Sequence, residues 1–404
     1  MARKTRVDEW LFASTAGLAL FGVAMVYSAS AVIAIGESGN DYQYVVKQGM
    51  WTLLGFVALF LGAMIDYRHW RATRLVYGLL ALTVVLLVSV FAFGAINGAH
   101  RWIRLAGFSL QPSELAKLAL IIFLARFLER RAGDEHNFLR TIAPAVCVTG
   151  LLIILIVAEP DLGTAMMLGV ACAVLLFAVG ARLTHLALLA APAFVGVAAL
   201  LIFVPFRMRR MTSFLDPWAD PLGAGYQVVQ SLLAVGSGGW RGLGFAEGRQ
   251  KMLFLPFSHS DFIFAVVCEE LGVTGALVLL GVFGFFLWRG VRIALRAPDR
   301  FGTLLGLGIV TVIVTQALFN MSVVLAILPT KGIPLPFISY GGSSLVPTLF
   351  SVGILLNISQ HANNSGGTRE FTTEAAWRET KRVVRPRSVS VSPTAPVWQP
   401  ERWR

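Results

Sequence analysis

The sequence predicts an all-α, polytopic integral membrane protein with about ten transmembrane helices. Of its 404 residues, 56% are hydrophobic and 14% are charged, whereas soluble domains have about 25% charged residues. The apolar residues form long runs separated by short polar segments, and a bilayer-spanning helix needs about 20 such residues. One long polar stretch, residues 206–261, interrupts this pattern and predicts a large loop between spans seven and eight.

Each predicted span is one apolar run. The ten runs are 11–34, 47–65, 74–93, 112–128, 141–158, 163–181, 184–205, 262–288, 303–328 and 343–360. The first could be a signal peptide cleaved near Ala29-Ser30-Ala31, but it is longer than the usual signal core of about 7–15 residues, which favours a retained span. Residues 1–10 then form a cytoplasmic N-terminus and 11–360 a transmembrane domain. Residues 361–404 are polar and predict a disordered, basic cytoplasmic tail.

Lysine and arginine residues predict the orientation of the chain. Short loops on one side carry 15 of them and those on the other side carry four. Because basic loops stay in the cytoplasm, both termini are expected inside and the 206–261 loop outside. The same clustering between apolar runs accounts for the net charge of +12 and indicates no nucleic-acid partner.

Within the outer loop, the sequence predicts a short amphipathic helix from Gly225 and a flexible glycine-rich turn over residues 236–244. The three cysteines, Cys147, Cys172 and Cys268, fall in apolar runs without metal-ligand spacing, so we expect small buried hydrophobes and no metal site there.

Two polar constellations precede or join spans on the outer side. Arg101 and Trp102 lie in the loop before the fourth span, whose first turns carry Glu114 and Lys117. Residues three apart share a helix face, so this pair is expected within salt-bridge reach and facing a cavity; the pair is either structural or binds an anionic lipid headgroup. Glu159-Pro-Asp161 forms the turn between spans five and six, either as a helix cap or as a functional site.

Two further constellations lie later in the chain. Asp261 follows His259 at the junction of the outer loop with span eight, where Asp261 could be a simple N-cap, and two more carboxylates, Glu269 and Glu270, follow. Residues 329–345 contain Lys331 and Ser343. This segment has too much Pro and Gly for a helix and is too apolar for a free loop, which predicts a re-entrant element lining a cavity.

A carboxylate, several cations and a polar cavity on one membrane face suit a polyisoprenyl-diphosphate substrate. The cations would neutralise a diphosphate leaving group, and the carboxylate would accept a proton from an attacking sugar hydroxyl. The local Ser258, His259 and Asp261 sequence does not by itself give triad geometry.

These motifs together resemble the SEDS family (shape, elongation, division and sporulation), which includes RodA and FtsW, over about residues 11–360. Val26-Tyr-Ser-Ala-Ser-Ala and Pro329-Thr-Lys-Gly look more like the FtsW, cell-division branch; Phe257 stands where the family usually has Glu. The motifs that carry the resemblance are Pro112-Ser-Glu-Leu-Ala-Lys, Glu159-Pro-Asp-Leu-Gly-Thr, His259-Ser-Asp-Phe-Ile-Phe, Glu269-Glu-Leu-Gly and Ile338-Ser-Tyr-Gly-Gly-Ser-Ser.

The resemblance implies a peptidoglycan glycosyltransferase that polymerises lipid II outside the bacterial cytoplasmic (inner) membrane for septal cell-wall synthesis, with inverting transfer and release of undecaprenyl diphosphate. It implies Asp261 as the general base. The expected substrate-binding residues are Arg101, Trp102, Glu114, Lys117, Arg210, His259, Lys331 and Ser343.

The implied partners are a class B penicillin-binding protein (an FtsI-like transpeptidase), other divisome membrane proteins and membrane lipids. No cofactor is certain from the motifs; a divalent cation, Mg or Mn, is the one candidate for sharing the diphosphate charge. Two alternative functions stay open at this point: a lipid II flippase, since ten spans and a polar cavity suit translocation, and a non-catalytic divisome scaffold.

Overall fold

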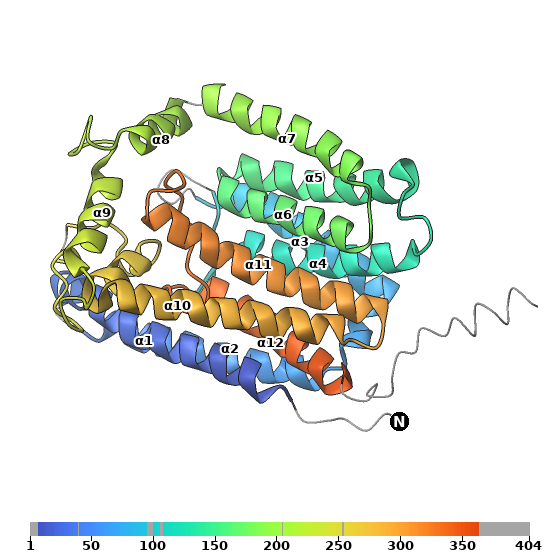
Figure 1. Ribbon diagram of the computed structural model, residues 1–404, viewed down its shortest axis with the longest axis horizontal. Helices are drawn as coiled ribbons and strands as arrows, with labels where there is room; N and C mark the ends of the chain where they lie inside the picture. Colours follow the sequence, from blue (N-terminus) through green and yellow to red (C-terminus); the bar gives the residue numbers. More distant parts are fainter. Residues whose placement is uncertain are drawn as a thin grey trace, which may run out of the picture. The chain divides into compact units, whose positions relative to one another are not determined.

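The computed structural model describes residues 7–38, 40–94, 100–105, 108–203, 205–252 and 254–362. Ten long helices in these parts coincide one by one with the ten predicted spans, although most boundaries shift by a few residues (Figure 1). They are α1 (Glu9–Ser38), α2 (Gln43–Met64), α3 (Thr73–Ser89), α4 (Pro112–Arg130), α5 (Ala143–Ala158), α6 (Leu162–Ala178), α7 (Leu183–Phe203), α10 (Ile263–Leu295), α11 (Arg300–Val324) and α12 (Gly342–Ala362). The predicted tail lies outside the described residues from 363 onward.

Seven segments of the described chain are long and apolar enough to cross a membrane: those of α1, α2, α3, α5, α10, α11 and α12. Helix α6 is apolar but shorter. Helix α4 is 19 residues long and carries Glu114, Lys117, Arg126 and Glu129 among its apolar residues. The all-α fold is therefore confirmed, while the number of ten spans stays a prediction.

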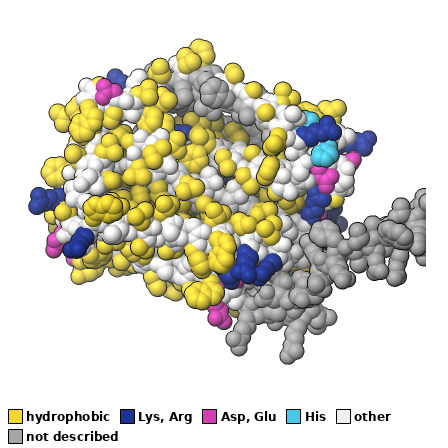
Figure 2. Space-filling model, viewed as in Figure 1, with side chains coloured by type: hydrophobic (Ala, Val, Ile, Leu, Met, Phe, Trp, Pro, Cys, Tyr) yellow, Lys and Arg dark blue, Asp and Glu magenta, His cyan; other side chains and the backbone are white. Residues whose placement is uncertain are grey.

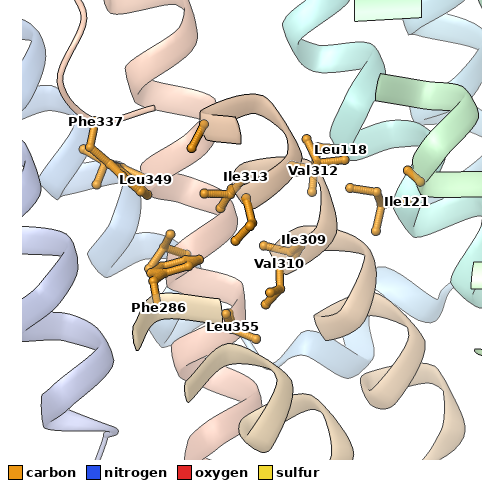
Figure 3. Packing of buried hydrophobic residues seen from close by; sticks show 14 of the residues in the cluster. Leu118, Ile121, Phe286, Ile309, Val310, Val312, Ile313, Phe337, Leu349 and Leu355 are labelled. Carbon is orange, nitrogen blue, oxygen red and sulfur yellow. The ribbon is translucent and has the colours of Figure 1, made fainter. Parts of the chain in front are cut away.

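The buried core lies around α4, α11 and α12. Fourteen of the 19 residues of α4 are buried, and α4 packs against α3, α6 and α11. In the most apolar stretches of α11 and α12, 72% of residues are buried, against 22% in α3. Figure 3 shows how this core interlocks: Ile121 of α4 lies near Ile309 of α11, and Leu355 of α12 lies near Val310. Apolar helices with exposed faces, such as α3, suit a lipid-facing position.

Three smaller elements lie between the spans. Helix α9 (Tyr226–Gly238) confirms the predicted helix in the long loop, and it packs on α10. Helix α8 (Pro205–Leu215) and an antiparallel pair of strands, β1 (Ile103–Leu105) and β2 (Phe108–Leu110), were not predicted. Strands of three residues are too short to produce the alternating pattern by which a strand is recognised. Short helical turns complete the chain at η1 (Tyr67–Arg71), η2 (Val90–Ala92) and η3 (Phe138–Ile142).

The segment between α11 and α12 is non-helical and enters the protein interior. Leu335, Phe337 and Ile338 are each at most 2% exposed. The ring of Phe337 packs against Phe283 and Phe286 of α10, with centroids 6.5 and 5.9 Å away. The predicted irregular element over 329–345 is thus present up to the start of α12 and lies against protein, as its apolar composition requires.

The two ends of the helix bundle differ in their charged groups. The basic end, defined as segments 65–72, 131–142 and 296–299 with the start of α1 and the end of α12, carries most of the ion pairs. The site end comprises segments 100–111, 159–161, 239–262 and 325–341. Figure 2 shows hydrophobic side chains across the middle of one face, with Lys and Arg near its edges.

Candidate functional site

Asp261 lies in the turn that leads into α10. The helix begins at Ile263 with Phe262 at the N-cap position, and no side chain caps it. The interpretation of Asp261 as an N-cap is therefore wrong. Its backbone carbonyl accepts a hydrogen bond from Asn320 Nδ2 at 2.7 Å. The residue as a whole is half-buried, and protein atoms surround its carboxyl closely.

The Asp261 carboxyl is surrounded by charges from three other segments. Burial raises its pKa to about 6, and the charge of Asp161 adds to that rise. The guanidinium groups of Arg101 and Arg210 oppose it by favouring the carboxylate. At neutral pH the carboxylate form predominates, yet its proton affinity is well above that of a free aspartate, which is what a general base needs.

Arg101 and Arg210 tie separate segments of the site end together. Arg101 Nε donates to the carbonyl of Glu159 at 2.9 Å, and its Nη2 donates to the carbonyl of Pro160. Arg210, on α8, donates to the carbonyl of Thr330 at 3.3 Å. Burial lowers the pKa of Arg210, and the neighbouring charge of Arg101 lowers it further. Two guanidinium groups therefore lie in the electrostatic field of one carboxylate.

The Glu159-Pro-Asp161 turn separates into two roles. Asp161 is the N-cap of α6: its Oδ1 accepts the amide hydrogen of Thr164 at 3.2 Å, and its Oδ2 accepts the Thr164 hydroxyl at 2.8 Å. Gln111 Nε2 also donates to Asp161, at 3.2 Å. Glu159 is 0% exposed, and neither carboxyl oxygen has a hydrogen-bond partner among the described residues. Burial first, then the charge of Asp161, raises the pKa of Glu159 to about 8 against the opposing effect of Arg101.

Glu114 and Lys117 form the predicted ion pair. Lys117 Nζ lies 2.8 Å from Glu114 Oε2, and both side chains are buried. Lys117 also donates to Gln316 Oε1 at 2.7 Å, and Gln316 Nε2 donates to the carbonyl of Pro334 at 2.9 Å. The pair lines a small cavity together with Gln316, Thr348 and residues of α11 and α12. The expectation that the pair faces a cavity is confirmed.

The remaining predicted residues have other neighbours. The ring of His259 lies against Tyr44 and Tyr340, with centroids 5.0 and 5.6 Å away. Ser343 donates to the carbonyl of Ser109 in β2. Lys331 Nζ lies 3.0 Å from Met166 Sδ, and Trp102 is half-buried immediately before β1.

The sequence interpretation missed three residues that hold this site. Asn320 donates to the carbonyls of Asp261 and Ile333, and the hydroxyl of Ser339 donates to the carbonyl of Ser260 at 2.6 Å. Gln316 is one helical turn before Asn320 on α11. Two amides four residues apart in an apolar run are the signal that could have found them, since buried polar groups need partners.

The described residues contain no group of three or more His, Cys, Asp or Glu side chains placed to hold a metal ion.

Comparison with known proteins identifies the family. The family model described as "Cell cycle protein", which covers FtsW, RodA and SpoVE, matches residues 9–364. This chain belongs to that family. Together with the apolar helices, membership makes the chain an integral membrane protein and confirms the resemblance drawn from the motifs.

Two curated relatives and one solved structure show how far the similarity extends. The probable peptidoglycan glycosyltransferase FtsW of Geobacter metallireducens is 44% identical over 355 residues, which are 88% of this chain and 95% of the relative. Stage V sporulation protein E of Bacillus subtilis is 40% identical over 361 residues, 89% of this chain and 99% of the relative. A chain in a peptidoglycan synthase complex, solved to explain how polymerization and crosslinking are coordinated, is 30% identical with a TM-score of 0.72; the match covers 89% of this chain and 99% of that one.

Proposed function

We propose that this protein is a peptidoglycan glycosyltransferase that polymerises lipid II, with Asp261 as its catalytic base. The observation that carries the assignment is the Asp261 carboxyl, whose pKa burial raises and whose charged form Arg101 and Arg210 favour. Family membership supports the reaction, since relatives at 42–44% identity carry the name peptidoglycan glycosyltransferase. Septal cell-wall synthesis is the use that the FtsW-like motifs suggest.

The reaction is an inverting glycosyl transfer. Asp261 accepts the proton of the acceptor sugar hydroxyl as the hydroxyl oxygen attacks the anomeric carbon of the lipid-linked donor. The bond from that carbon to the diphosphate breaks, and undecaprenyl diphosphate leaves with the negative charge. Arg101 and Arg210 stabilise this charge where it develops, as cationic donors do in phosphate-releasing sites. Asp261 then gives its proton to water, which restores the carboxylate.

The other predicted residues take supporting roles in this proposal. Glu114 and Lys117 form a neutral pair beside a small cavity and bind the lipid-linked substrate when it occupies the site. In this proposal His259, Trp102, Lys331 and Ser343 bind the sugar or peptide parts of the substrate.

The orientation is inferred from the Lys and Arg distribution. With the basic end in the cytoplasm, the site end faces the outer side of the bacterial inner membrane, where lipid II is presented. A class B penicillin-binding protein that cross-links the product is the proposed partner, supported by the similarity to a chain of a peptidoglycan synthase complex.

The decisive experiment is Asp261→Asn in the purified full-length protein with lipid II as substrate. An amide has nearly the size of the carboxylate but cannot accept the proton, and loss of a general base typically costs about 10²–10⁴-fold in rate. We expect a folded, membrane-inserted variant that makes no detectable polymer. A variant that polymerised lipid II at nearly the parent rate would show that Asp261 is not the base. Lipid II transport into vesicles without polymer, by the parent protein, would favour a flippase.

Orientation is tested by thiol labelling in intact cells. In a cysteine-free background, single cysteines are placed at Ser237, which is exposed at the end of α9, and at Ser388 in the tail. A membrane-impermeant reagent should label position 237 and not 388. The opposite pattern would move the Asp261 site to the cytoplasm and contradict the proposed function.

A further inference from the structure

Two adjacent carboxylates of α10 are fully buried and take no part in the mechanism above. Glu269 and Glu270 are 0% and 1% exposed, and they follow Asp261 by about two helical turns. A buried carboxylate is costly unless it is paired or accepts hydrogen bonds. The partners of these two side chains therefore indicate what they hold in place.

Glu270 joins three segments of the chain. Its Oε1 accepts the hydroxyl of Ser28 at 2.5 Å and the ammonium of Lys251 at 2.6 Å. Lys251 Nζ also donates to Ser28 Oγ at 2.8 Å, and the lysine is only 3% exposed. Ser28 belongs to α1, Lys251 to the loop before Asp261, and Glu270 to the helix after it. We call this triad of Ser28, Lys251 and Glu270 the clasp.

The two carboxylates also bind the backbone of the loop directly. Glu269 Oε1 accepts the amide hydrogens of Arg249 and Gln250 at 2.8 and 3.1 Å. Glu270 Oε2 accepts the amide hydrogen of Ala246 at 3.0 Å. The loop therefore depends on α10 for the partners of part-buried backbone groups.

A kink in α10 adds a second set of bonds to the same loop. Gly272 has φ 67° and non-helical geometry, which frees carbonyl and amide groups of the adjoining turns. The carbonyls of the two glutamates accept the amide hydrogens of Leu243 and Gly244 at 3.0 Å each. In return, Val273 and Thr274 donate to loop carbonyls at 2.9 and 3.2 Å. The glycine-rich segment was expected to be a flexible turn; a turn is present, but these bonds fix it against α10.

The clasp closes a loop of chain around Asp261. Lys251 lies ten residues before the aspartate and Glu270 lies nine residues after it, so their contact joins both flanks of the site. Ser258, between them, donates to the carbonyl of Ala29, the residue after Ser28 on α1. We propose that Lys251 and Glu270 are positioning residues that fix the Asp261 carboxylate against the acceptor hydroxyl. This inference rests on the glycosyl transfer proposed above.

The need to position the Asp261 carboxylate can explain the clasp, whereas its contribution to folding stability alone cannot. A general base must lie within about 2.6–3.2 Å of the proton that it accepts, and a displacement of about 1 Å can cost about 10²-fold in rate. In contrast, neutral side chains of similar size often replace a buried ion pair without loss of stability, provided both partners change together. A neutral double variant should therefore fold and lose the positioning.

The test is Lys251→Met/Glu270→Gln in the purified full-length protein, with lipid II polymerisation followed between pH 5 and 8. We expect kcat to fall by about 10–100-fold with little change in KM. A loosened loop admits water to Asp261, whose raised pKa comes mainly from burial, so the acid limb of the rate profile should move to lower pH by about one unit. The charged groups that face Asp261, namely Arg101, Arg210 and Asp161, are unchanged in this variant.

The single variant Lys251→Met leaves Glu270 buried without its cation and should fold poorly, and the second substitution should restore folding. Ser28→Ala is the milder variant: it removes one bond of the clasp and should give a few-fold loss of kcat with an acid-limb shift in the same direction. The matched control is Asp8→Asn/Arg289→Met, which removes the ion pair at the opposite end of α10 and should leave the acid limb in place.

A folded double variant with the parent kcat and an unchanged acid limb would overturn the inference, because a purely structural clasp changes only the amount of folded protein. If the double variant is not recovered folded, Ser28→Ala decides by the same two readouts. Failure of the underlying function looks different: Asp261→Asn would then remain active whatever the clasp variants do.

Discussion

The two ends of the helix bundle shift the pKa values of carboxyl groups in opposite directions. At the basic end, Glu129 lies 2.8 Å from Arg71 and Glu135 lies 2.8 Å from Arg300, and backbone hydrogen bonds together with that arginine lower the pKa of Glu135 to about 2. At the site end, burial raises the pKa of Asp261 to about 6 and that of Glu159 to about 8. Paired carboxylates hold loops together, whereas desolvated ones keep a proton affinity that chemistry can use.

Glu114 and Lys117 break this division, as Lys251 and Glu270 do, because each is a tight ion pair at the site end. Removing one partner of a buried pair costs about 3–5 kcal/mol, since the other charge stays buried alone. We therefore expect Lys117→Met to lower the free energy of unfolding of the detergent-purified protein by about 3–5 kcal/mol. This is the largest change in stability in this comparison, and a thermal melt would detect it. Lys117→Met/Glu114→Gln should recover most of it.

Lipid II polymerisation by the double variant then shows whether the Glu114–Lys117 pair binds substrate or is only structural. If the pair contacts substrate, as we propose, the stable double variant stays impaired in lipid II polymerisation. Parent-level polymerisation by that variant would place the pair with the structural ion pairs of the basic end. Asp8→Asn/Arg289→Met serves as the matched double substitution at that end.

The contrast between these groups also explains what the sequence could and could not predict. The ten helices follow from apolar runs of sufficient length, and the Glu114–Lys117 pair follows from local i, i+3 spacing. The convergence of Arg101, Arg210 and Asp161 on Asp261 has no local signal, because the four residues lie far apart in the chain. The partnership of Lys251 with Glu270 was missed for the same reason, although Glu270 itself was noticed as an unusual carboxylate.

Substitution of Arg101 tests how charge controls the pKa of Asp261 at the site end. Its charge opposes the burial that raises the pKa of Asp261, so Arg101→Gln should raise that pKa further. The acid limb of the polymerisation profile is then expected to move to higher pH, opposite to the clasp variants. Loss of a cation at the diphosphate should lower the maximal rate by about 10²-fold.

The control for this substitution is Arg209→Gln, which removes an exposed arginine next to Arg210 on α8. It should leave both the maximal rate and the acid limb unchanged. If both variants lost the same fraction of the maximal rate and neither acid limb moved, net charge near the membrane would be the cause rather than the charge facing Asp261.

The smallest predicted effects come from one carboxyl of each end, and they differ in sign. Glu159 has a raised pKa of about 8, so between its ordinary value of 4.5 and pH 8 the folded protein binds a proton that the unfolded chain releases. Its contribution to stability is full at low pH and is lost as pH rises through that window. Glu159→Gln keeps a neutral side chain, so the free energy of unfolding of the variant should fall less steeply between pH 5 and 8, by up to about 1.4 kcal/mol per pH unit.

Glu135 should behave in the reverse way. Its lowered pKa of about 2 stabilises the folded protein above pH 4.5, and this contribution is lost as pH falls towards 2. Because Arg300 and Glu135 are 34% and 19% exposed, solvent screens the pair, and Glu135→Gln should cost only about 0.2–1 kcal/mol at pH 7. Thermal melts of Glu159→Gln across pH 5–8 and of Glu135→Gln across pH 2–5 would measure the two slopes. If Glu159 and Glu135 changed the slope of unfolding free energy against pH in the same direction, burial at the site end would not raise the pKa of Glu159. The proposed difference between the carboxyl groups of the two ends would then be wrong.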